Sequence, residues 1–129
     1  MTECPDNLRY TERHEWVRVE QDGIIVVGIT DYAQSQMGDL VFVESPMLND
    51  QVSAGQEAAV VESVKTASDV YSPVTGKIVA INEVLTDQPE MVNQEPYQSG
   101  WLFKVKLDDI SELDHLMQSS DYQKQLVEE

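Results

Sequence analysis

Short runs of branched and aromatic residues, bounded by turn-forming residues, recur along most of the chain. They cover residues 16–19, 24–29, 40–43, 58–61 and 101–107. Runs of about four to eight such residues are typical of β-strands, because β-branched and aromatic side chains pack well on a pleated surface. The sequence therefore predicts a mainly β fold, and every other element has to lie around a sheet.

Turn signals set the order of the first elements. Asp22 and Gly23 separate the first two runs, and an Asp-Gly pair supplies the positive φ that a tight β-hairpin needs. Asp31 can cap a short helix, with Gln34 returning the hydrogen bond three residues later, and Gly38 can end that helix in the left-handed conformation. We expect a hairpin, then a short helix, then a strand at residues 40–43.

The second half of the chain contains one stretch that breaks regular structure and one that favours helices. Residues 86–100 hold several breakers, namely Pro89, Asn93, Pro96 and Gly100. Such a composition is typical of a loop. Near the end, two capping-box patterns follow each other, Ser111 with Asp114 and Ser120 with Gln123. We expect a long loop before the last strand and two short helices over about residues 111–127.

Length and charge limit the classes of function. A chain of 129 residues fits one compact domain, which we expect to span residues 1–129 as a monomer. Its 24 acidic and 8 basic residues give a formal net charge of −16, which would repel nucleic acid and anionic lipid and favour basic protein partners. No apolar run approaches the roughly 20 residues of a membrane-spanning helix, and the first residues resemble neither a secretory signal nor a transit peptide. We expect a cytoplasmic protein that binds neither nucleic acid nor membrane.

The cysteine and histidine content does not indicate a metal or disulfide centre. Cys4 is the only cysteine, so neither an intrachain disulfide nor a thiolate cluster can form. His14 is expected to order a local hydrogen-bond network, and His115 to lie on an exposed helix face. The large aromatic side chains fit a β-core better than a ligand site: Trp16, Trp101 and Phe103. We expect no metal site.

Lys65 lies in a polar turn between two apolar arms, at residues 58–61 and 70–71. A hairpin there would place its amine at or beside the tip. An unperturbed lysine, with a pKa of about 10.4, is protonated at neutral pH and is a poor nucleophile. Glu62 and Asp69 favour the charged form further. Acylation of Lys65 by another enzyme is therefore feasible, but a hairpin tip also favours lysine for solubility alone, and without further context solubility is the simpler interpretation.

The sequence around this turn resembles the lipoyl-lysine motif of glycine cleavage H proteins. The motif runs through Glu62-Ser-Val-Lys65, Ser68-Asp69, Ser72-Pro73 and Gly76. Similar motifs outside it are His14-Glu15-Trp16, Val27-Gly-Ile-Thr-Asp31, Gly38-Asp39, Val41-Phe-Val-Glu44, Val92-Asn93, Pro96-Tyr97 and Gly100-Trp101. Biotin carriers and the lipoyl domains of 2-oxoacid dehydrogenases commonly differ at the two residues that flank the lysine, here Val64 and Thr66. The resemblance covers nearly the whole chain.

What the resemblance implies is a flattened β-barrel of two sheets, a barrel-sandwich hybrid lipoyl-type domain with short peripheral helices and a lipoyl hairpin at about residues 58–82. It implies a non-catalytic carrier with lipoic acid attached covalently to Lys65. Glycine decarboxylase, a pyridoxal phosphate enzyme, would load the lipoyl group with the aminomethyl group of glycine. Aminomethyltransferase would pass the one-carbon unit to tetrahydrofolate, and dihydrolipoyl dehydrogenase would reoxidise the carrier. Lipoate-attaching enzymes are further implied partners, and tethering raises the effective concentration of the group at each site.

The resemblance also makes two carboxylates, Glu15 and Asp69, candidates for holding the cationic amine of the loaded arm in a groove. The alternative is that both are ordinary surface charges. Tyr32 stands where many relatives have histidine, and Arg13 stands where some have a small hydroxyl residue. Since a cation at Arg13 would oppose a cationic amine, these departures weaken the groove hypothesis and leave Lys65 untouched.

Other functions stay open at this stage. A carrier with the same lipoyl chemistry could relay lipoyl groups to 2-oxoacid dehydrogenases. A small enzyme could use Lys65 as a Schiff-base catalyst, although the acidic surroundings argue against this. A pure interaction module would never be modified.

Overall fold

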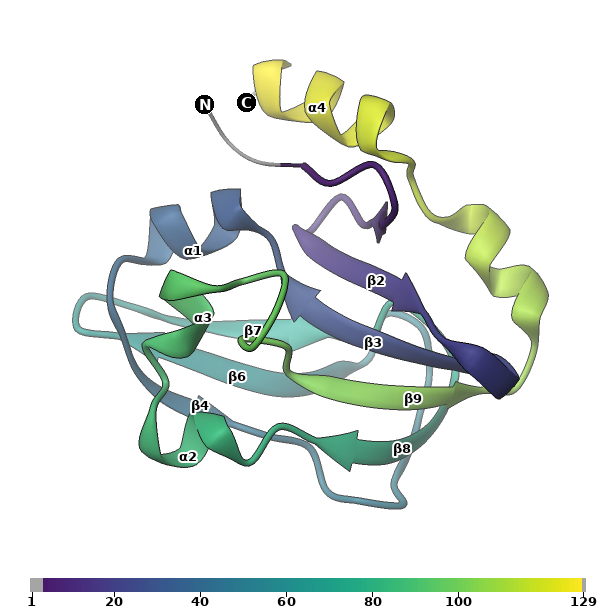
Figure 1. The fold of residues 1–129 in the computed structure, drawn as a ribbon, viewed down its shortest axis with the longest axis horizontal. Helices are drawn as coiled ribbons and strands as arrows, with labels where there is room; N and C mark the ends of the chain where they lie inside the picture. Colours follow the sequence, from purple (N-terminus) through teal and green to yellow (C-terminus); the bar gives the residue numbers. More distant parts are fainter. Residues whose placement is uncertain (1–3, 129) are drawn as a thin grey trace.

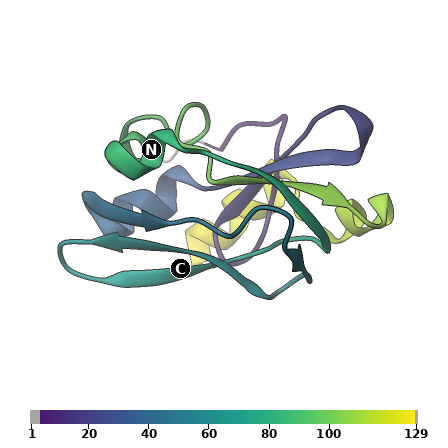
Figure 2. The same ribbon diagram turned by 90° about the horizontal axis from the view of Figure 1, so that it is seen from below.

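The computed structural model describes residues 4–128, and within this range nine strands form two antiparallel sheets. The larger sheet has the strand order β1 (Arg9–Tyr10), β2 (Glu15–Val19), β3 (Ile24–Ile29), β9 (Phe103–Leu107), β8 (Gly76–Ile81) and β5 (Gln51–Val52). The smaller sheet has the order β4 (Leu40–Glu44), β6 (Glu57–Ser63) and β7 (Ala67–Tyr71). The sheets lie as layers of a flattened barrel-sandwich (Figures 1 and 2) and confirm the expected fold class.

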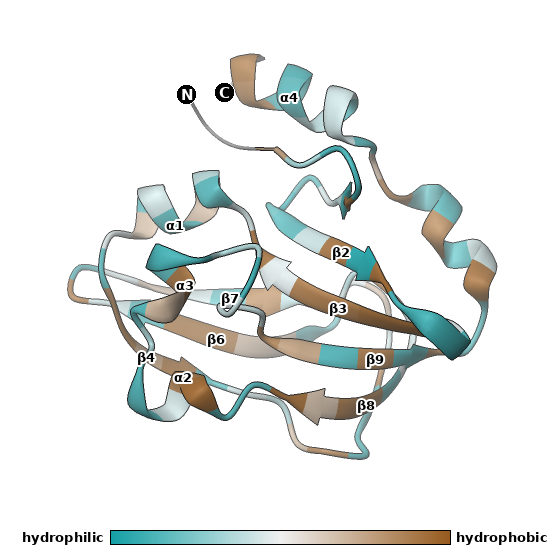
Figure 3. Ribbon diagram, viewed as in Figure 1, coloured by the Kyte–Doolittle hydropathy of each residue, from teal (hydrophilic) through white to brown (hydrophobic). Residues whose placement is uncertain are grey.

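The main core fills the space between the sheets. β3 is apolar along almost its whole length (Figure 3) and is buried from Ile25 onward. One of its faces contributes Ile25, Val27 and Ile29 to the main core, while Val26 faces a second cluster. That second cluster is largely aromatic and contains Leu8, Tyr10, Trp16, Val26, Tyr97 and Tyr122. Burial on both faces explains why β3 is a continuous apolar run instead of an alternating one.

The first hairpin is confirmed, and the helix after it differs in its cap. Asp22 and Gly23 have φ values of 61° and 75° in the short 3₁₀ turn η1 (Gln21–Gly23), as the Asp-Gly pair predicts. Helix α1 spans Asp31–Met37, and its N-cap is Thr30, whose side chain accepts from the N–H of Ala33. Asp31 is instead the first helical residue. The strand ends one residue earlier than a cap at Asp31 requires, so the preceding threonine takes that role.

The loop expected at residues 86–100 is wrong in part. Two one-turn helices, α2 (Val84–Asp87) and α3 (Met91–Gln94), occupy much of this region. Each buries one apolar residue, Leu85 or Val92, in the main core. Pro89, Pro96 and Gly100 fall between and after these turns, where they do not interrupt them, whereas Asn93 lies within α3. The single apolar anchors were too sparse for a helical period to be read from the sequence.

Two helical segments close the chain at nearly the expected positions. The first, η2 (Ile110–His115), is a 3₁₀ segment whose cap is Asp109, and not an α-helix capped by Ser111. His115 is exposed, as expected. The second, α4 (Ser119–Glu128), places Tyr122 in the second cluster. α4 packs on the outside of the larger sheet beside β1 (Figure 1), whereas Leu113 of η2 packs against the main core.

The hairpin expected at about residues 58–82 is shorter than predicted, because it ends with β7 at Tyr71. β6 and β7 pair as expected, but β8 pairs with β5 and β9 in the other sheet. The turn before Gly76 is therefore a crossing between sheets. Gly76 has no positive φ, and a Cβ there would overlap the carbonyl oxygen of Lys106. Close approach of β9, and not turn geometry, requires glycine at this position.

Among residues 4–128, no helix is long and apolar enough to cross a membrane. The cytoplasmic location, the single domain over residues 1–129 and the monomeric state stay predictions.

Candidate functional site

Lys65 lies at the tip of the β6–β7 hairpin. Three residues, Val64, Lys65 and Thr66, connect the strands, and all three are exposed. The turn is fixed by the largely buried Ser63, whose hydroxyl accepts from the N–H groups of Lys65 at 3.3 Å and Thr66 at 3.2 Å. The N–H of Ser63 also donates to the carbonyl of Thr66 at 2.8 Å. Lys65 therefore lies on a projecting turn whose conformation is fixed by the hydrogen bonds of Ser63.

The hairpin tip lies against the end of α1. A Cβ built on Gly38 would be 3.3 Å from Cε of Lys65, so the lysine stem passes close to this glycine. Asn93 from α3 makes three hydrogen bonds of 2.9 Å to the segment where α1 ends and β4 begins. Its amide NH₂ donates to the carbonyl of Gly38 and to Oε1 of Gln34, and its Oδ1 accepts from the N–H of Leu40. The sequence marks Asn93 as a loop residue and as part of the Val92-Asn93 motif, and neither predicts this positioning role.

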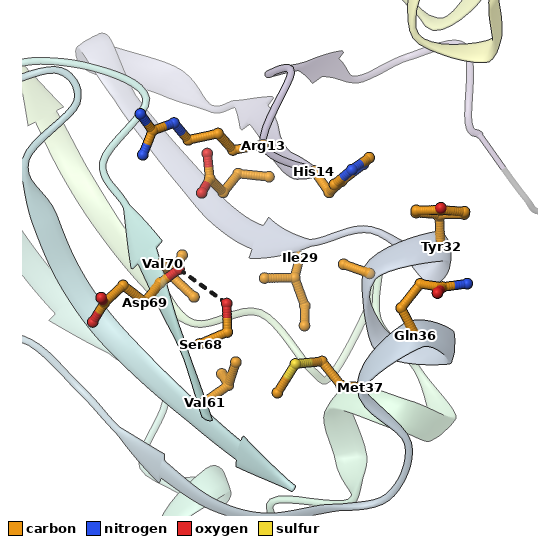
Figure 4. A pocket seen from close by; sticks show the side chains of 12 residues that line it. Arg13, His14, Ile29, Tyr32, Gln36, Met37, Val61, Ser68, Asp69 and Val70 are labelled. Carbon is orange, nitrogen blue, oxygen red and sulfur yellow. Dashed lines mark hydrogen bonds between the residues drawn. The ribbon is translucent and has the colours of Figure 1, made fainter. Parts of the chain in front are cut away.

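A groove of about 320 Å³ runs between α1 and the hairpin. Its apolar lining comes from Ile29, Ala33, Met37, Val61 and Val70. Its polar lining comes from Arg13, His14, Glu15, Tyr32, Gln36, Ser68 and Asp69 (Figure 4). The structure therefore brings both candidate carboxylates, and both departures at Arg13 and Tyr32, to one groove. These residues come from segments that are far apart in the sequence.

Glu15 is a buried carboxylate and not an ordinary surface charge. Only 3% of its surface is exposed. Its Oε1 accepts from the hydroxyl of Thr11 at 2.7 Å, and its Oε2 accepts from the N–H of Tyr71 at 3.1 Å. Burial raises the pKa of Glu15, and the hydrogen bonds from Thr11 and Tyr71 oppose that rise, as does the charge of Arg13. Burial of the Glu15 carboxylate is therefore unfavourable for its charged form, and the two hydrogen-bond donors oppose this effect.

Asp69 differs from Glu15 in its exposure to solvent. It is exposed on β7, and its carboxylate points away from Ile29 and Met37 (Figure 4).

Arg13 lies with its guanidinium carbon 4.1 Å from the ring centroid of Tyr71, a cation–π arrangement. The guanidinium is therefore held on the hairpin side.

The opposite end of the groove is ordered by aromatic side chains. The ring of His14 lies 4.8 Å from that of Tyr32, and its Nδ1 lies 2.8 Å from the hydroxyl of Tyr122. His14 therefore takes part in a local hydrogen-bond network, as expected. Among residues 4–128, no three His, Cys, Asp or Glu side chains could together hold a metal ion.

Comparison with known proteins decides the family. The family model described as glycine cleavage H-protein matches residues 8–129. The glycine cleavage system H proteins of Teredinibacter turnerae and Alcanivorax borkumensis are 56% and 57% identical over 129 residues, covering 100% of this chain and 99% and 100% of the relatives. The crystal structure of a glycine cleavage system H protein from Mycobacterium marinum superposes with a TM-score of 0.88 at 38% identity, over 95% of this chain and 98% of that one.

The chain belongs to the glycine cleavage H-protein family. This confirms the function expected from the resemblance: the chain is the lipoyl carrier of the glycine cleavage system and is not a catalytic component. Membership also argues against the Schiff-base enzyme. The site is compatible with a lipoyl group. Lys65 is exposed for attachment, and the groove beside it has both apolar and polar lining residues.

Proposed function

We propose that Lys65 is the residue that carries the lipoyl group, in amide linkage to its side-chain nitrogen. Exposure of Lys65 at the tip of a hairpin, beside a groove of about 320 Å³, is the observation that carries this proposal. When bound, the lipoyl group supplies the disulfide that receives the aminomethyl group of glycine. The chain itself presents the amine to a modifying enzyme and offers the attached arm a place to lie.

The partners of this carrier are, we propose, glycine decarboxylase, aminomethyltransferase and dihydrolipoyl dehydrogenase, with lipoate-attaching enzymes acting beforehand. The formal net charge of −16 suits partner surfaces rich in Lys and Arg, because complementary charge speeds encounter and suppresses wrong partners. A relay of lipoyl groups to 2-oxoacid dehydrogenases stays an untested alternative.

The groove next to Lys65 is proposed to shelter the arm. Its apolar residues, such as Met37 and Val61, can cover a hydrocarbon chain. Glu15 and Asp69 line it and are proposed to attract the cationic amine of the loaded arm. Because the guanidinium of Arg13 stacks on the ring of Tyr71, its positive charge is fixed there and does not move through the groove.

Attachment is tested by intact-mass and peptide analysis of the full chain made in cells supplied with lipoate. Lys65→Arg should abolish the modification, while the matched control Lys77→Arg, at an exposed lysine on β8, should keep it. A bare Lys65 in cells that lipoylate a control protein would refute the proposal.

Sheltering is tested separately on lipoylated protein loaded with the aminomethyl group. Asp69→Ala should shorten the lifetime of the loaded arm, and Glu62→Ala, a nearby carboxylate outside the groove lining, should not. Equal lifetimes in the wild type and in Asp69→Ala and Glu15→Ala would contradict the role of the two carboxylates.

A further inference from the structure

The α1 side of the groove is fixed at both ends of the helix. At its start, the hydroxyl of Tyr97 accepts from the N–H of Asp31 at 2.9 Å, and the hydroxyl of Tyr122 lies 2.6 Å from Oγ1 of Thr30. At its end, Asn93 binds the carbonyl of Gly38. Since Tyr97, Tyr122 and Asn93 come from three different segments, α1 cannot shift without breaking several hydrogen bonds.

On the hairpin side of the groove, and among residues 4–128, β7 makes fewer hydrogen bonds beyond its own hairpin than α1 makes to other segments. β7 is an edge strand of the smaller sheet and pairs with β6 alone. Of the hydrogen bonds made by residues 4–128, a single one joins β7 to the larger sheet, from the N–H of Tyr71 to Oε2 of Glu15. The groove can therefore widen more easily on the hairpin side, and Glu15 is the polar tie that opposes this.

The surroundings of Glu15 keep this tie in place. Thr11 donates its hydroxyl to Oε1 and accepts from the N–H of Glu15 at 3.1 Å, which orients the carboxylate toward β7. Arg13 covers the ring of Tyr71 from the same side. Burying a carboxylate is unfavourable unless its oxygens have donors, and here both oxygens have one. Thr11, Arg13, Glu15 and Tyr71 form a unit that we call the β2–β7 latch.

We infer that Glu15 is a positioning residue that acts through Tyr71: it holds β7 against β2 and so sets the width of the groove beside Lys65. The inference deepens the proposed function and rests on it for the meaning of the groove. This positioning role and the proposed contact between Glu15 and the cationic amine require different properties of the Glu15 side chain. A contact with a cation needs the negative charge, whereas the latch needs only an acceptor for the N–H of Tyr71.

Two substitutions at Glu15 separate these requirements. Glu15→Gln removes the charge and keeps an oxygen for the N–H of Tyr71, although its NH₂ group then replaces the acceptor of the Thr11 hydroxyl, whose oxygen already accepts from the N–H groups of Arg13 and Glu15. Glu15→Ala removes the acceptor as well. Asp69→Asn is the matched control, since it removes a charge from the same groove without touching the latch.

The test is amide hydrogen exchange measured by NMR on the full, unmodified chain. Loss of a partner for a buried donor costs about 1–3 kcal/mol, which corresponds to exchange roughly 5- to 150-fold faster. Exchange at Tyr71 should accelerate by at least about fivefold in Glu15→Ala and by less than about threefold in Glu15→Gln and Asp69→Asn. Val27 in β3 serves as the core reference and should not change.

The outcomes divide cleanly. Unchanged exchange at Tyr71 in Glu15→Ala would overturn the inference, as would equal acceleration in Glu15→Gln, which would assign the effect to charge. Acceleration at Val27 by the same factor would show global loss of stability and would also overturn it. Because the chain in this experiment carries no lipoyl group, a failure of lipoylation at Lys65 would refute the proposed function and leave this result standing.

A second readout uses lipoylated protein and a water-soluble phosphine as reductant. The lipoyl disulfide should be reduced several times faster in Glu15→Ala than in the wild type, and at the wild-type rate in Glu15→Gln. Reduction at equal rates in all three proteins would show that the latch does not set access to the groove.

Discussion

The hydroxyl of Tyr122 lies 2.6 Å from Oγ1 of Thr30, and this contact joins the C-terminal helix to the N-cap of α1 across 92 residues of sequence. Tyr122 is fully buried and stacks on Tyr10 with their ring centroids 4.7 Å apart and an interplanar angle of 3°. Its hydroxyl also lies 2.8 Å from Nδ1 of His14, a groove residue. The helix α4 therefore supports one wall of the groove from outside the β-core.

Tyr122→Phe should lower the free energy of unfolding by about 1–3 kcal/mol, because the hydroxyl of Thr30 would lose a buried partner. Urea denaturation followed by fluorescence measures this. Tyr32→Phe is the control, since the Tyr32 hydroxyl makes no hydrogen bond within residues 4–128 that would be lost. Equal stability losses in the two variants would show that the Tyr122 hydroxyl is not a specific support.

Asn93→Asp should lower the free energy of unfolding by at least about 2 kcal/mol. The substitution removes the NH₂ group that binds the carbonyl of Gly38 and Oε1 of Gln34, and it places a carboxylate oxygen against both acceptors. The control is Gln94→Glu, which adds a charge at the next residue of α3, on an exposed side chain. Thermal denaturation of both variants checks this, and a similar change in both would attribute the loss to net charge.

Local signals predicted much of the fold, because they depend on a few neighbouring residues. The Asp22-Gly23 turn has both positive φ values. Gly38 ends α1 with a positive φ of 83°, but its ψ of −165° lies outside the left-handed helical region that was expected. The sequence did not show which residue caps α1, since that depends on where β3 stops. It also did not reveal α2 and α3, because each is anchored by a single buried side chain whose depth is set by the sheets around it.

The candidate site residues were found from sequence motifs, and their arrangement was predicted less well. Motif resemblance marked Lys65, Glu15 and Asp69, and the structure places the two carboxylates in one groove. The burial of Glu15 was not predicted, because it results from the approach of Tyr71 on the other sheet, 56 residues away. For the same reason, Asn93 could not be recognised as a support of the turn beside Lys65.

Gly76→Ala should be far more destabilising than Gly55→Ala, although Gly55 is the one with a positive φ. A Cβ at Gly76 would meet backbone atoms of Lys106, so β8 and β9 would have to separate, at a cost of about 3 kcal/mol or more. At Gly55, with φ of 84°, a Cβ would meet nothing within 4 Å, and only the backbone penalty of about 1–2 kcal/mol applies. Urea midpoints for the two variants in the reverse order would contradict the assigned role of Gly76.

The buried Glu15 should give the protein a specific dependence on pH. Burial raises its pKa in the folded state above the ordinary value of 4.5, so the folded state holds this proton more tightly than the unfolded state does. The stabilising effect of protonated Glu15 is complete below the unfolded pKa and is lost as pH rises through the folded pKa. Glu15→Gln imitates the protonated form at every pH. The free energy of unfolding of the wild type, minus that of Glu15→Gln, should therefore fall as pH rises above 4.5.

Asp109→Asn provides a comparison of opposite sign. The hydrogen bonds from the hydroxyl and the N–H of Ser111 lower the pKa of Asp109, so its ionised form stabilises the folded state above the unfolded pKa, and this is lost as pH falls through the folded pKa. The wild type minus Asp109→Asn difference should rise with pH in the acidic range. Urea denaturation of the three proteins across a pH series measures both slopes. Slopes of the same sign, or a flat difference for Glu15→Gln, would mean that desolvation does not dominate the environment of Glu15, since its two hydrogen bonds would then outweigh the burial of its charge.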